Sequence, residues 1–230
     1  MNHLTRLFNG QLPELIMYDL DGTLLNSAPD LIHATQHMLN SMKLPPAKDN
    51  DIIKWLGNGI PALIKRALAN DMRGNEPGKV DESLFSQSQQ LFNRHYSKVL
   101  GQYSQPYTGV MPFLEAMKNQ NITQAIVTNK SLDFSQRLSG MKGFSPYISY
   151  ILGGDSLALS KPDPLPLTHT IEHFQVKPEN ALMVGDSKND VIAAKAAGIK
   201  VIGLPYGYNH GEPLERSEPD LIIPDLSQLL

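Results

Sequence analysis

Five short apolar runs, each bounded by Gly, Asp, Asn or Pro, constrain the fold of this chain more than any other feature. They occupy residues 15–18, 125–127, 181–184, 201–204 and 221–223. Short runs that are apolar at every position are typical of strands buried in a parallel sheet. Helical patterns lie between most of these runs, for example Val110, Phe113, Leu114 and Met117 on one face. The alternation predicts an α/β core with a parallel sheet.

The stretch from residue 28 to residue 105 breaks the alternation, because it has helical periodicity but no convincing strand. Its first helix is expected to open with Ser27 and Asp30 at the spacing of a capping box and to carry Pro29 in its first turn. A later helix is indicated by an apolar stripe, and Gly and Pro predict a loop over 71–79. The residues of that stripe are Leu84, Ser88, Leu91, His95 and Val99, flanked by Phe85 and Phe92.

We therefore predict two domains. Residues 28–105 form an all-helical domain, and residues 1–27 and 106–230 form a discontinuous core. The insertion leaves the core directly after the first strand, so we expect it to lie over that strand's end as a lid.

Composition excludes several functions. The chain of 230 residues has no cysteine, which rules out disulfides, thiolate nucleophiles and cysteine-based metal sites. Its net charge of −3 is unlike the basic surplus of nucleic-acid-binding proteins. The N-terminus has no apolar run of membrane-spanning or secretory length. We expect a cytoplasmic protein with no nucleic-acid, membrane or obligate protein partner.

Two carboxylates, Asp19 and Asp21, follow the first apolar run directly. The carboxyl ends of parallel strands are where α/β proteins bind their ligands. A spacing of two residues places both side chains on one side of an extended backbone, and Gly22 allows a sharp turn after them. The alternative is that Asp21 and Gly22 only form a turn at the end of a strand.

The segment Asp19-Leu20-Asp21-Gly22-Thr23 resembles the first motif of the haloacid dehalogenase superfamily, whose members are mostly phosphatases. Three further segments resemble the remaining motifs in the expected order. They are Val127-Thr128-Asn129-Lys130, Ser160-Lys161-Pro162 and Val184-Gly185-Asp186-Ser187-Lys188-Asn189-Asp190. The resemblance implies a Rossmann-like α/β core with the helical insertion as its cap.

The resemblance also implies the catalytic roles. Asp19 is the nucleophile that forms an aspartyl phosphate, and Asp21 is the general acid and base. Thr128 and Lys161 bind the phosphoryl group and neutralise its charge. The residues implied in binding the phosphate end of the substrate are Gly22, Thr128, Asn129 and Lys161.

Mg²⁺ is the implied cofactor, because it prefers oxygen ligands. Its implied ligands are Asp19, Asp186 and the main-chain carbonyl of Asp21, with Asp190 orienting the surrounding shell. Two residues also allow plainer interpretations. Lys161 taken alone resembles a solvated surface lysine, and Asp186 with Ser187 resembles the cap of a helix.

The cap is the part that decides the substrate in this superfamily. Here the stretch from Trp55 to Leu68 is similar to the cap of bacterial phosphoglycolate phosphatases. We expect Asn58 and Gly59 to present an anion site at the start of a helix, and Arg66 to clamp a small carboxylate. Lys65 competes for that role. The alternative is that the glycines only form a helix-entry turn and that Arg66 faces solvent.

These features together predict a Mg²⁺-dependent phosphatase of a small phosphorylated metabolite, with 2-phosphoglycolate as the expected substrate. The alternatives, in order, are a phosphatase of a sugar phosphate or nucleotide, a sugar phosphomutase and a non-catalytic binding protein.

Overall fold

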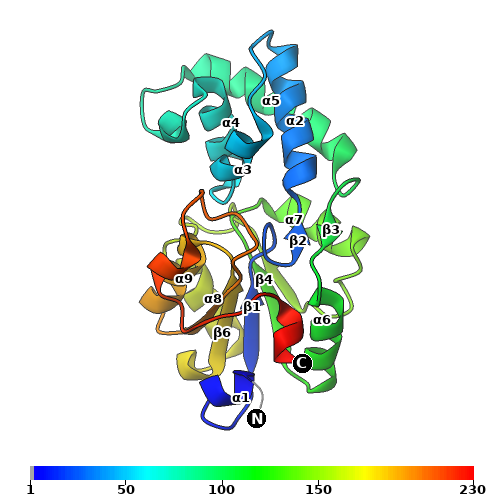
Figure 1. The fold of residues 1–230 in the computed structure, drawn as a ribbon, viewed down its shortest axis with the longest axis vertical. Coiled ribbons are helices and arrows are strands. Elements are labelled where there is room, and N and C mark those ends of the chain that lie inside the picture. Colours follow the sequence, from blue (N-terminus) through cyan, green and yellow to red (C-terminus); the bar gives the residue numbers. More distant parts are fainter. Residues whose placement is uncertain (1–2) are drawn as a thin grey trace.

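A computed structural model describes residues 3–230, and its centre is a sheet of six parallel strands (Figure 1). The strand order is β5-β4-β1-β6-β7-β8, which places β1 between β4 and β6. The strands are β1 (Leu15–Tyr18), β4 (Thr123–Val127), β5 (Tyr150–Leu152), β6 (Ala181–Gly185), β7 (Lys200–Gly203) and β8 (Leu221–Ile222).

All five predicted strands are confirmed, with ends that differ by no more than two residues. The edge strand β5 was missed. It has only three residues, and two of them, Tyr150 and Ile151, are half-buried, so it lacks the continuous apolar run of an interior strand.

Helices cover both faces of the sheet. One face packs against α6, α7 and the C-terminal turn η4, and the other packs against α8 and α9. The elements outside the cap are α1 (His3–Leu7), α6 (Val110–Asn119), α7 (Leu132–Met141), α8 (Leu165–Phe174), α9 (Lys188–Ala196), and the 3-10 turns η2 (Pro178–Asn180), η3 (Leu214–Ser217) and η4 (Leu226–Leu229).

Strand β1 shows how the two layers are built. Ile16 and Tyr18 belong to one apolar cluster, whereas Leu15 and Met17 belong to the other, because successive side chains point to opposite faces. The buried Tyr18 hydroxyl donates to Oε1 of Gln124 on β4 at 2.9 Å. This hydrogen bond accommodates a polar group deep in the core.

The inserted helices form a separate layer above the sheet, which we call the cap (Figure 1). The structure places a 3-10 turn inside the stretch predicted as a loop. The cap elements are α2 (Ala28–Ser41), α3 (Asp49–Trp55), α4 (Gly59–Ala69), η1 (Met72–Asn75) and α5 (Glu82–Val99).

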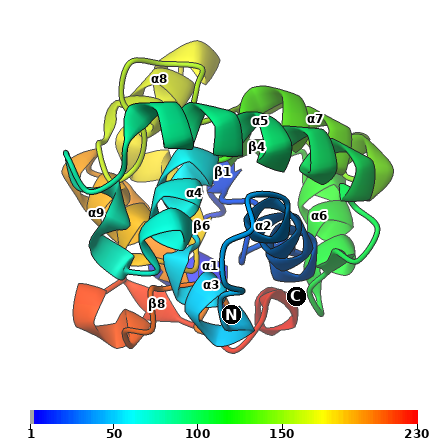
Figure 2. The ribbon, with the colours of Figure 1, turned by 90° about the horizontal axis from the view of Figure 1, so that it is seen from above.

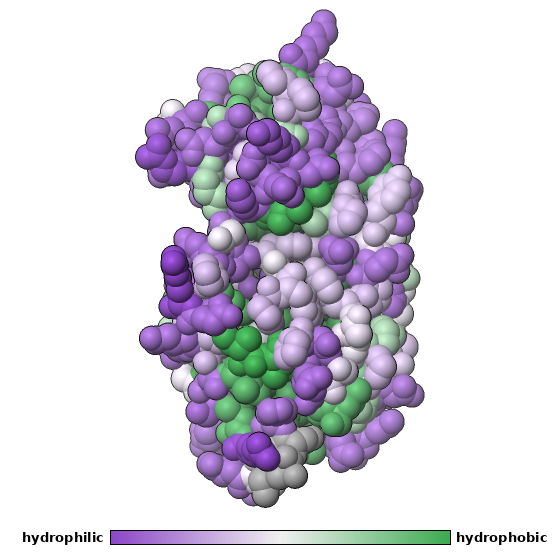
Figure 3. Space-filling model, in the orientation of Figure 1, coloured by the Kyte–Doolittle hydropathy of each residue, from purple (hydrophilic) through white to green (hydrophobic). Residues whose placement is uncertain are grey.

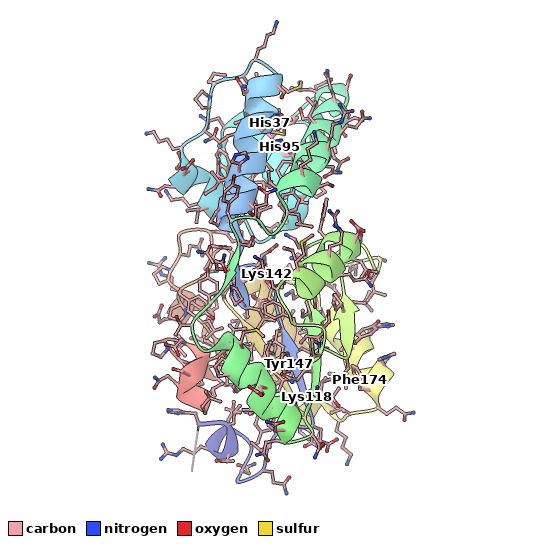
Figure 4. The ribbon with its side chains drawn as sticks, turned by 90° about the vertical axis from the view of Figure 1, so that its right-hand side faces the viewer. His37, His95, Lys118, Lys142, Tyr147 and Phe174 are labelled. Atoms are coloured by element: carbon pink, nitrogen blue, oxygen red, sulfur yellow. The ribbon has the colours of Figure 1, made fainter. Side chains whose placement is uncertain are left out.

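The predicted helix is confirmed as α5, and its predicted stripe is buried in part, at Ser88 and Val99. The helix buries Ser88, Phe92, Tyr96 and Val99, a face shifted from the predicted one. The ring of His95 instead stacks on the exposed ring of His37 of α2, with 3.6 Å between the two ring centroids (Figure 4). The apolar positions of α5 allow more than one stripe, and packing on α2 selects between them.

The predicted capping box at the start of α2 is wrong. Ser27 makes no capping hydrogen bond. The buried Asp30 carboxylate instead accepts hydrogen bonds from the main-chain N–H groups of Gly101 and Tyr103, both at 2.8 Å, and from the hydroxyl of Ser104. Asp30 therefore joins the start of the cap to the segment that returns to the core.

Two chain crossings connect the cap to the core. They pair as short antiparallel strands, β2 (Leu25–Asn26) and β3 (Gln105–Pro106). Near this ribbon, Lys142 of the core donates to the main-chain oxygens of Gly101 and Ser104 at 2.7 and 2.6 Å (Figure 4). These contacts fix the base of the cap.

No helix among residues 3–230 is both long enough and apolar enough to span a membrane.

Candidate active site

The sheet order brings the motif residues together. Asp19 follows β1, Thr128 follows β4 and Asp186 follows β6, and β1 lies between the other two strands. The chain turns to opposite sides of β1 in making β4 and β6, so the strand ends diverge into a crevice there. The structure therefore brings these three motif segments together at one edge of the sheet.

Asp19 lies at the base of this crevice. Its main-chain N–H donates to Val184 O at 3.0 Å, and its Oδ1 accepts the N–H of Leu20 at 2.7 Å. The side chain is mostly buried but lines the cavity. Burial raises the pKa of Asp19 to about 6, against the opposing attraction of Lys161 and the hydroxyl of Thr128.

Lys161 is 2% exposed, so its interpretation as a solvated surface lysine is wrong. Its Nζ donates to Val127 O and to Asp190 Oδ1, both at 2.7 Å, and lies 3.3 Å from Asp19 Oδ1. Burial acts to lower the pKa of Lys161, but the charges of Asp19 and Asp190 outweigh it and raise the pKa. Lys161 is therefore a fixed positive charge beside Asp19.

Both carboxylate oxygens of Asp190 accept hydrogen bonds. Its Oδ1 accepts from Lys161, and its Oδ2 accepts from the N–H and the hydroxyl of Ser187 at 3.0 and 2.9 Å. Ser187 and Asp190 thereby form a capping box at the start of α9. The helix-cap interpretation of this motif is correct for Ser187, and the same cap holds Asp190 against Lys161.

Asp186 is the third buried carboxylate of the site. Its Oδ1 accepts from the Thr23 hydroxyl at 2.5 Å, and its Oδ2 accepts from the N–H of Tyr208 at 2.6 Å. Burial, with the charges of Asp19 and Asp190, raises the pKa of Asp186 well above its ordinary value. One oxygen from each of these three carboxylates lies within 4.8 Å of the other two.

The main chain at Gly22 and Gly207 packs closely against the carboxylate of Asp186. Gly22 has φ of +89°, as its predicted sharp turn requires, and a Cβ there would lie 2.3 Å from Asp186 Oδ2. A Cβ on Gly207 would lie 2.2 Å from the same atom. No side chain fits at either position.

Lys130 is a residue of the site to which the sequence analysis gave no role. Its Nζ lies 2.9 and 3.1 Å from the two carboxylate oxygens of Asp21 and 4.9 Å from the ring centroid of Tyr96 on α5. Burial opposes its charge, but Asp21 outweighs that effect and raises the pKa of Lys130. Its place two residues after Thr128, at a strand end, was the signal that could have found it.

Thr128 and Asn129 complete the core side. Thr128 is 4% exposed, and its Oγ1 accepts the N–H of Lys130 at 3.2 Å. The amide nitrogen of Asn129 donates to Lys161 O at 2.8 Å and to Gly57 O of the cap at 3.0 Å. Asn129 therefore connects the site to the cap.

Core and cap enclose a cavity of about 30 Å³. Viewed from above, α2, α4 and α5 lie across the strand ends (Figure 2), and the surface narrows where the cap meets the core (Figure 3). The core contributes polar residues to the cavity, and the cap contributes apolar side chains and glycines. The lining residues are Asp19, Asp21, Thr128, Asn129 and Lys130 from the core, and Leu31, Leu56, Gly57, Gly59, Ile60 and Leu63 from the cap.

Arg66 and Asn58 are not among the residues that line this cavity. Arg66 is 5% exposed, so its solvent-facing interpretation is wrong. Its guanidinium donates to Met72 O, Trp55 O and Asn58 Oδ1 at 3.0, 2.6 and 3.0 Å. The structure does not bring Arg66 to the cavity, and its role as a carboxylate clamp stays a prediction.

The competing Lys65 pairs with Glu82 of the cap at 3.1 Å. It also lies outside the cavity lining. Gly59 does line the cavity, at the start of α4.

The late loop after β7 contacts the cap at two points. The Tyr208 hydroxyl accepts the N–H of Ala28 at 3.0 Å and donates to Asn26 Oδ1 at 2.6 Å. His210 Nδ1 donates to Lys54 O at 3.0 Å. Because the N–H of Tyr208 also holds Asp186, this loop links the base of the cap to the carboxylate cluster.

Comparison with known proteins agrees with this geometry. Residues 16–204 match the model of the haloacid dehalogenase-like hydrolases, and the chain belongs to that family. It is 40% identical, over its whole length and 83% of the relative's, to a protein of Pseudomonas fluorescens (strain Pf0-1) named phosphoglycolate phosphatase.

A protein of the same name from Thiobacillus denitrificans is 41% identical over 93% of this chain and 92% of its own. The crystal structure of a predicted phosphoglycolate phosphatase from Haemophilus somnus 129PT superposes with a TM-score of 0.87. It is 38% identical and covers 93% of this chain and 95% of its own.

Proposed function

We propose that this hydrolase is a phosphomonoesterase that transfers the phosphoryl group of a small ester first to Asp19 and then to water, and that its substrate is 2-phosphoglycolate. One observation carries the proposal: the Asp19 carboxylate lines the cavity between core and cap, and the buried cation of Lys161 lies 3.3 Å from it on the other side. A carboxylate can attack an anionic ester only where nearby positive charge offsets the repulsion.

The first step forms a bond between a carboxylate oxygen of Asp19 and phosphorus as the ester P–O bond breaks. Asp21 gives its proton to the departing oxygen and then takes one from the water that hydrolyses the aspartyl phosphate. Lys161 and Thr128 hold the phosphoryl oxygens, and the turn at Gly22 leaves the main chain open to them.

The donor set fits a divalent cation. Asp19, Asp21, Asp186 and Asp190 face only Lys130 and Lys161, so carboxylates exceed lysines by two. Asp190 already pairs with the Lys161 cation and caps α9, so we assign the ligand roles to Asp19 and Asp186, with the main-chain carbonyl of Asp21. Carboxylate and carbonyl oxygens suit Mg²⁺, which when bound neutralises charge between substrate and Asp19.

The choice of substrate rests on the relatives. With the cap in this position, the cavity has a volume of about 30 Å³, room for about two water molecules, so the cap must move before any phosphate ester enters. The relatives named phosphoglycolate phosphatase match the chain over nearly its full length, including the cap.

The test is phosphate release from 2-phosphoglycolate, a sugar phosphate and a nucleotide, each with Mg²⁺ and with a chelator. We expect 2-phosphoglycolate with Mg²⁺ to be the fastest, and we expect Asp19→Asn to be inactive. Isomerisation of a sugar phosphate without free phosphate would indicate a mutase instead. No release under any condition would leave a binding protein.

A further inference from the structure

Lys130 occupies a distinctive place in the site. Of the described residues that line the cavity, it is the one with a cationic side chain. Lys161 lies behind Asp19 and is not part of the lining. An anionic group that enters the cavity on the side of Asp21 therefore meets Lys130.

The partners of Lys130 in the structure are few. Its side chain is 1% exposed, and Asp21 is the carboxylate with which it pairs. Tyr96 is a second partner, with its ring centroid 4.9 Å from Nζ and its hydroxyl also interacting with the ammonium group. Attraction to an aromatic face is weaker than an ion pair, so Asp21 holds most of the compensation for this buried charge.

Entry of a substrate disturbs this pair. A buried cation without an anionic partner is strongly unfavourable, so a group that displaces Asp21 from Lys130 must bring an anion of its own. A substrate carboxylate does so, whereas an uncharged group does not.

The opposite wall offers no competing cation. The cap lines the cavity with Leu31, Leu56, Ile60 and Leu63 and with two glycines. Arg66 is engaged with two main-chain oxygens and Asn58. A carboxylate on the substrate thus has Lys130 as its one charged partner among the described lining residues.

On the basis of the proposed function, we infer that Lys130 is the specificity residue that binds the substrate carboxylate. As the substrate enters, its carboxylate replaces Asp21 as the partner of Lys130. The substrate class is a short phosphorylated hydroxy acid, in which few atoms separate the carboxylate from the phosphate.

The test compares 2-phosphoglycolate with ethyl phosphate, in which a methyl group replaces the carboxylate. We expect wild-type kcat/KM to favour 2-phosphoglycolate by about 100-fold or more, since a site built around a charged partner discriminates strongly. Lys130→Met should lower kcat/KM for both substrates, but more for 2-phosphoglycolate, so that the ratio of the two values falls to within about fivefold. The main cause is a higher KM for 2-phosphoglycolate, because its carboxylate binds more weakly. Lys130→Arg restores part of the preference.

Lys118→Met is the matched control. Lys118 also lies over a tyrosine ring, that of Tyr147 at 5.6 Å, but on α6 far from the cavity (Figure 4). The Lys118→Met variant should keep the wild-type preference for 2-phosphoglycolate over ethyl phosphate. Where Lys130→Met does not fold, Lys130→Gln serves, because it keeps the length and polarity of the side chain without the charge.

An equal fold-loss on both substrates would overturn the inference, because Lys130 would then only position Asp21. A wild-type protein without preference for the carboxylate overturns it as well. If the wild type hydrolyses another carboxylated ester but not 2-phosphoglycolate, the proposed substrate fails. The same comparison, made with that ester and its uncharged counterpart, then decides the role of Lys130.

Discussion

The two walls of the cavity differ in chemistry. The core wall carries two carboxylates, a lysine, a hydroxyl and an amide, and the cap wall carries apolar side chains and main chain. The charges of the core wall therefore face an apolar surface, beside which electrostatic interactions are stronger than in open water. Under the proposed function, we expect the core to perform the reaction and the cap to limit the size of the substrate and the access of water.

The two walls meet through one main-chain oxygen of the cap. Gly57 O accepts hydrogen bonds from the side-chain amides of Asn129 at 3.0 Å and Asn189 at 3.1 Å. Both asparagines belong to the predicted motif segments of the core. The position of the cap is thus set partly by residues next to the reacting groups.

The largest effect is expected from Asp19→Asn on the core wall. It should lower kcat by about 10⁴ or more, since it removes the nucleophile. The metal-free variant should also be more stable than wild type at pH 7.5. Burial raises the pKa of Asp19 to about 6, so its ionised form destabilises the metal-free fold by about 3 kcal/mol.

The pH dependence of the free energy of unfolding tests whether ionised Asp19 destabilises the metal-free fold. The raised pKa means that Asp19 contributes favourably below about pH 4, near the carboxyl pKa of an unfolded chain, and that the contribution is lost as the pH rises through 6. Urea unfolding of both proteins in chelator should therefore give curves that converge toward pH 4. A variant that is less stable at pH 7.5 would contradict the account of Asp19 as a costly buried charge.

A smaller effect is expected from Gly207→Ala, which tests the packing behind the core wall. The added Cβ would lie 2.2 Å from Asp186 Oδ2, so the carboxylate must move. We expect kcat/KM to fall by about 100-fold, because small displacements of a catalytic group are costly, and the Mg²⁺ concentration for half-maximal activity to rise. Gly140→Ala, where the nearest atom is 3.9 Å away, should change neither.

Arg66→Met tests whether the cap wall contributes charge to binding. Because the guanidinium joins three parts of the cap, its loss should reduce the free energy of unfolding by about 2–4 kcal/mol. Activity should fall by less than tenfold, and equally for 2-phosphoglycolate and ethyl phosphate. A selective loss on 2-phosphoglycolate would support the predicted carboxylate clamp and would mean that the two walls share specificity.

The smallest effect is expected from Ile60→Ala, which enlarges the cavity from the cap side. The half-buried Ile60 lines the cavity and bears no polar group. With 2-phosphoglycolate as substrate, we expect kcat/KM to change by about threefold, mainly in KM, because lost apolar contact affects binding more than chemistry. A larger ester such as 3-phosphoglycerate should gain relative to wild type. Unchanged relative rates would show that the cap wall does not set substrate size.

The parts of the site that could be predicted are those coded by local sequence. Asp19 and Asp186 directly follow apolar runs, and parallel strands present their carboxyl ends at one edge, so these residues had to approach one another. The same runs predicted five of the six strands. β5 was missed because a three-residue edge strand has too weak a pattern.

Other features depended on partners distant in the chain. Asp30 has the spacing of a helix cap, yet it binds the main chain about 70 residues away, at Gly101 and Tyr103. Arg66 has the chemistry of a carboxylate clamp, yet its donors are satisfied within the cap. Charged side chains of this kind can satisfy the same hydrogen-bonding capacity in several ways, and only packing selects one.

The sequence by itself determined the α/β core, the helical insertion and the order of the four motifs, because strand length, apolar periodicity and motif spacing are local properties. The tertiary structure alone decided that Lys161 is buried against Asp19 and Asp190, that Lys130 pairs with Asp21, and that the cap wall is apolar where it faces them. The physical reason is that burial and charge pairing depend on which distant groups share a space from which water is excluded.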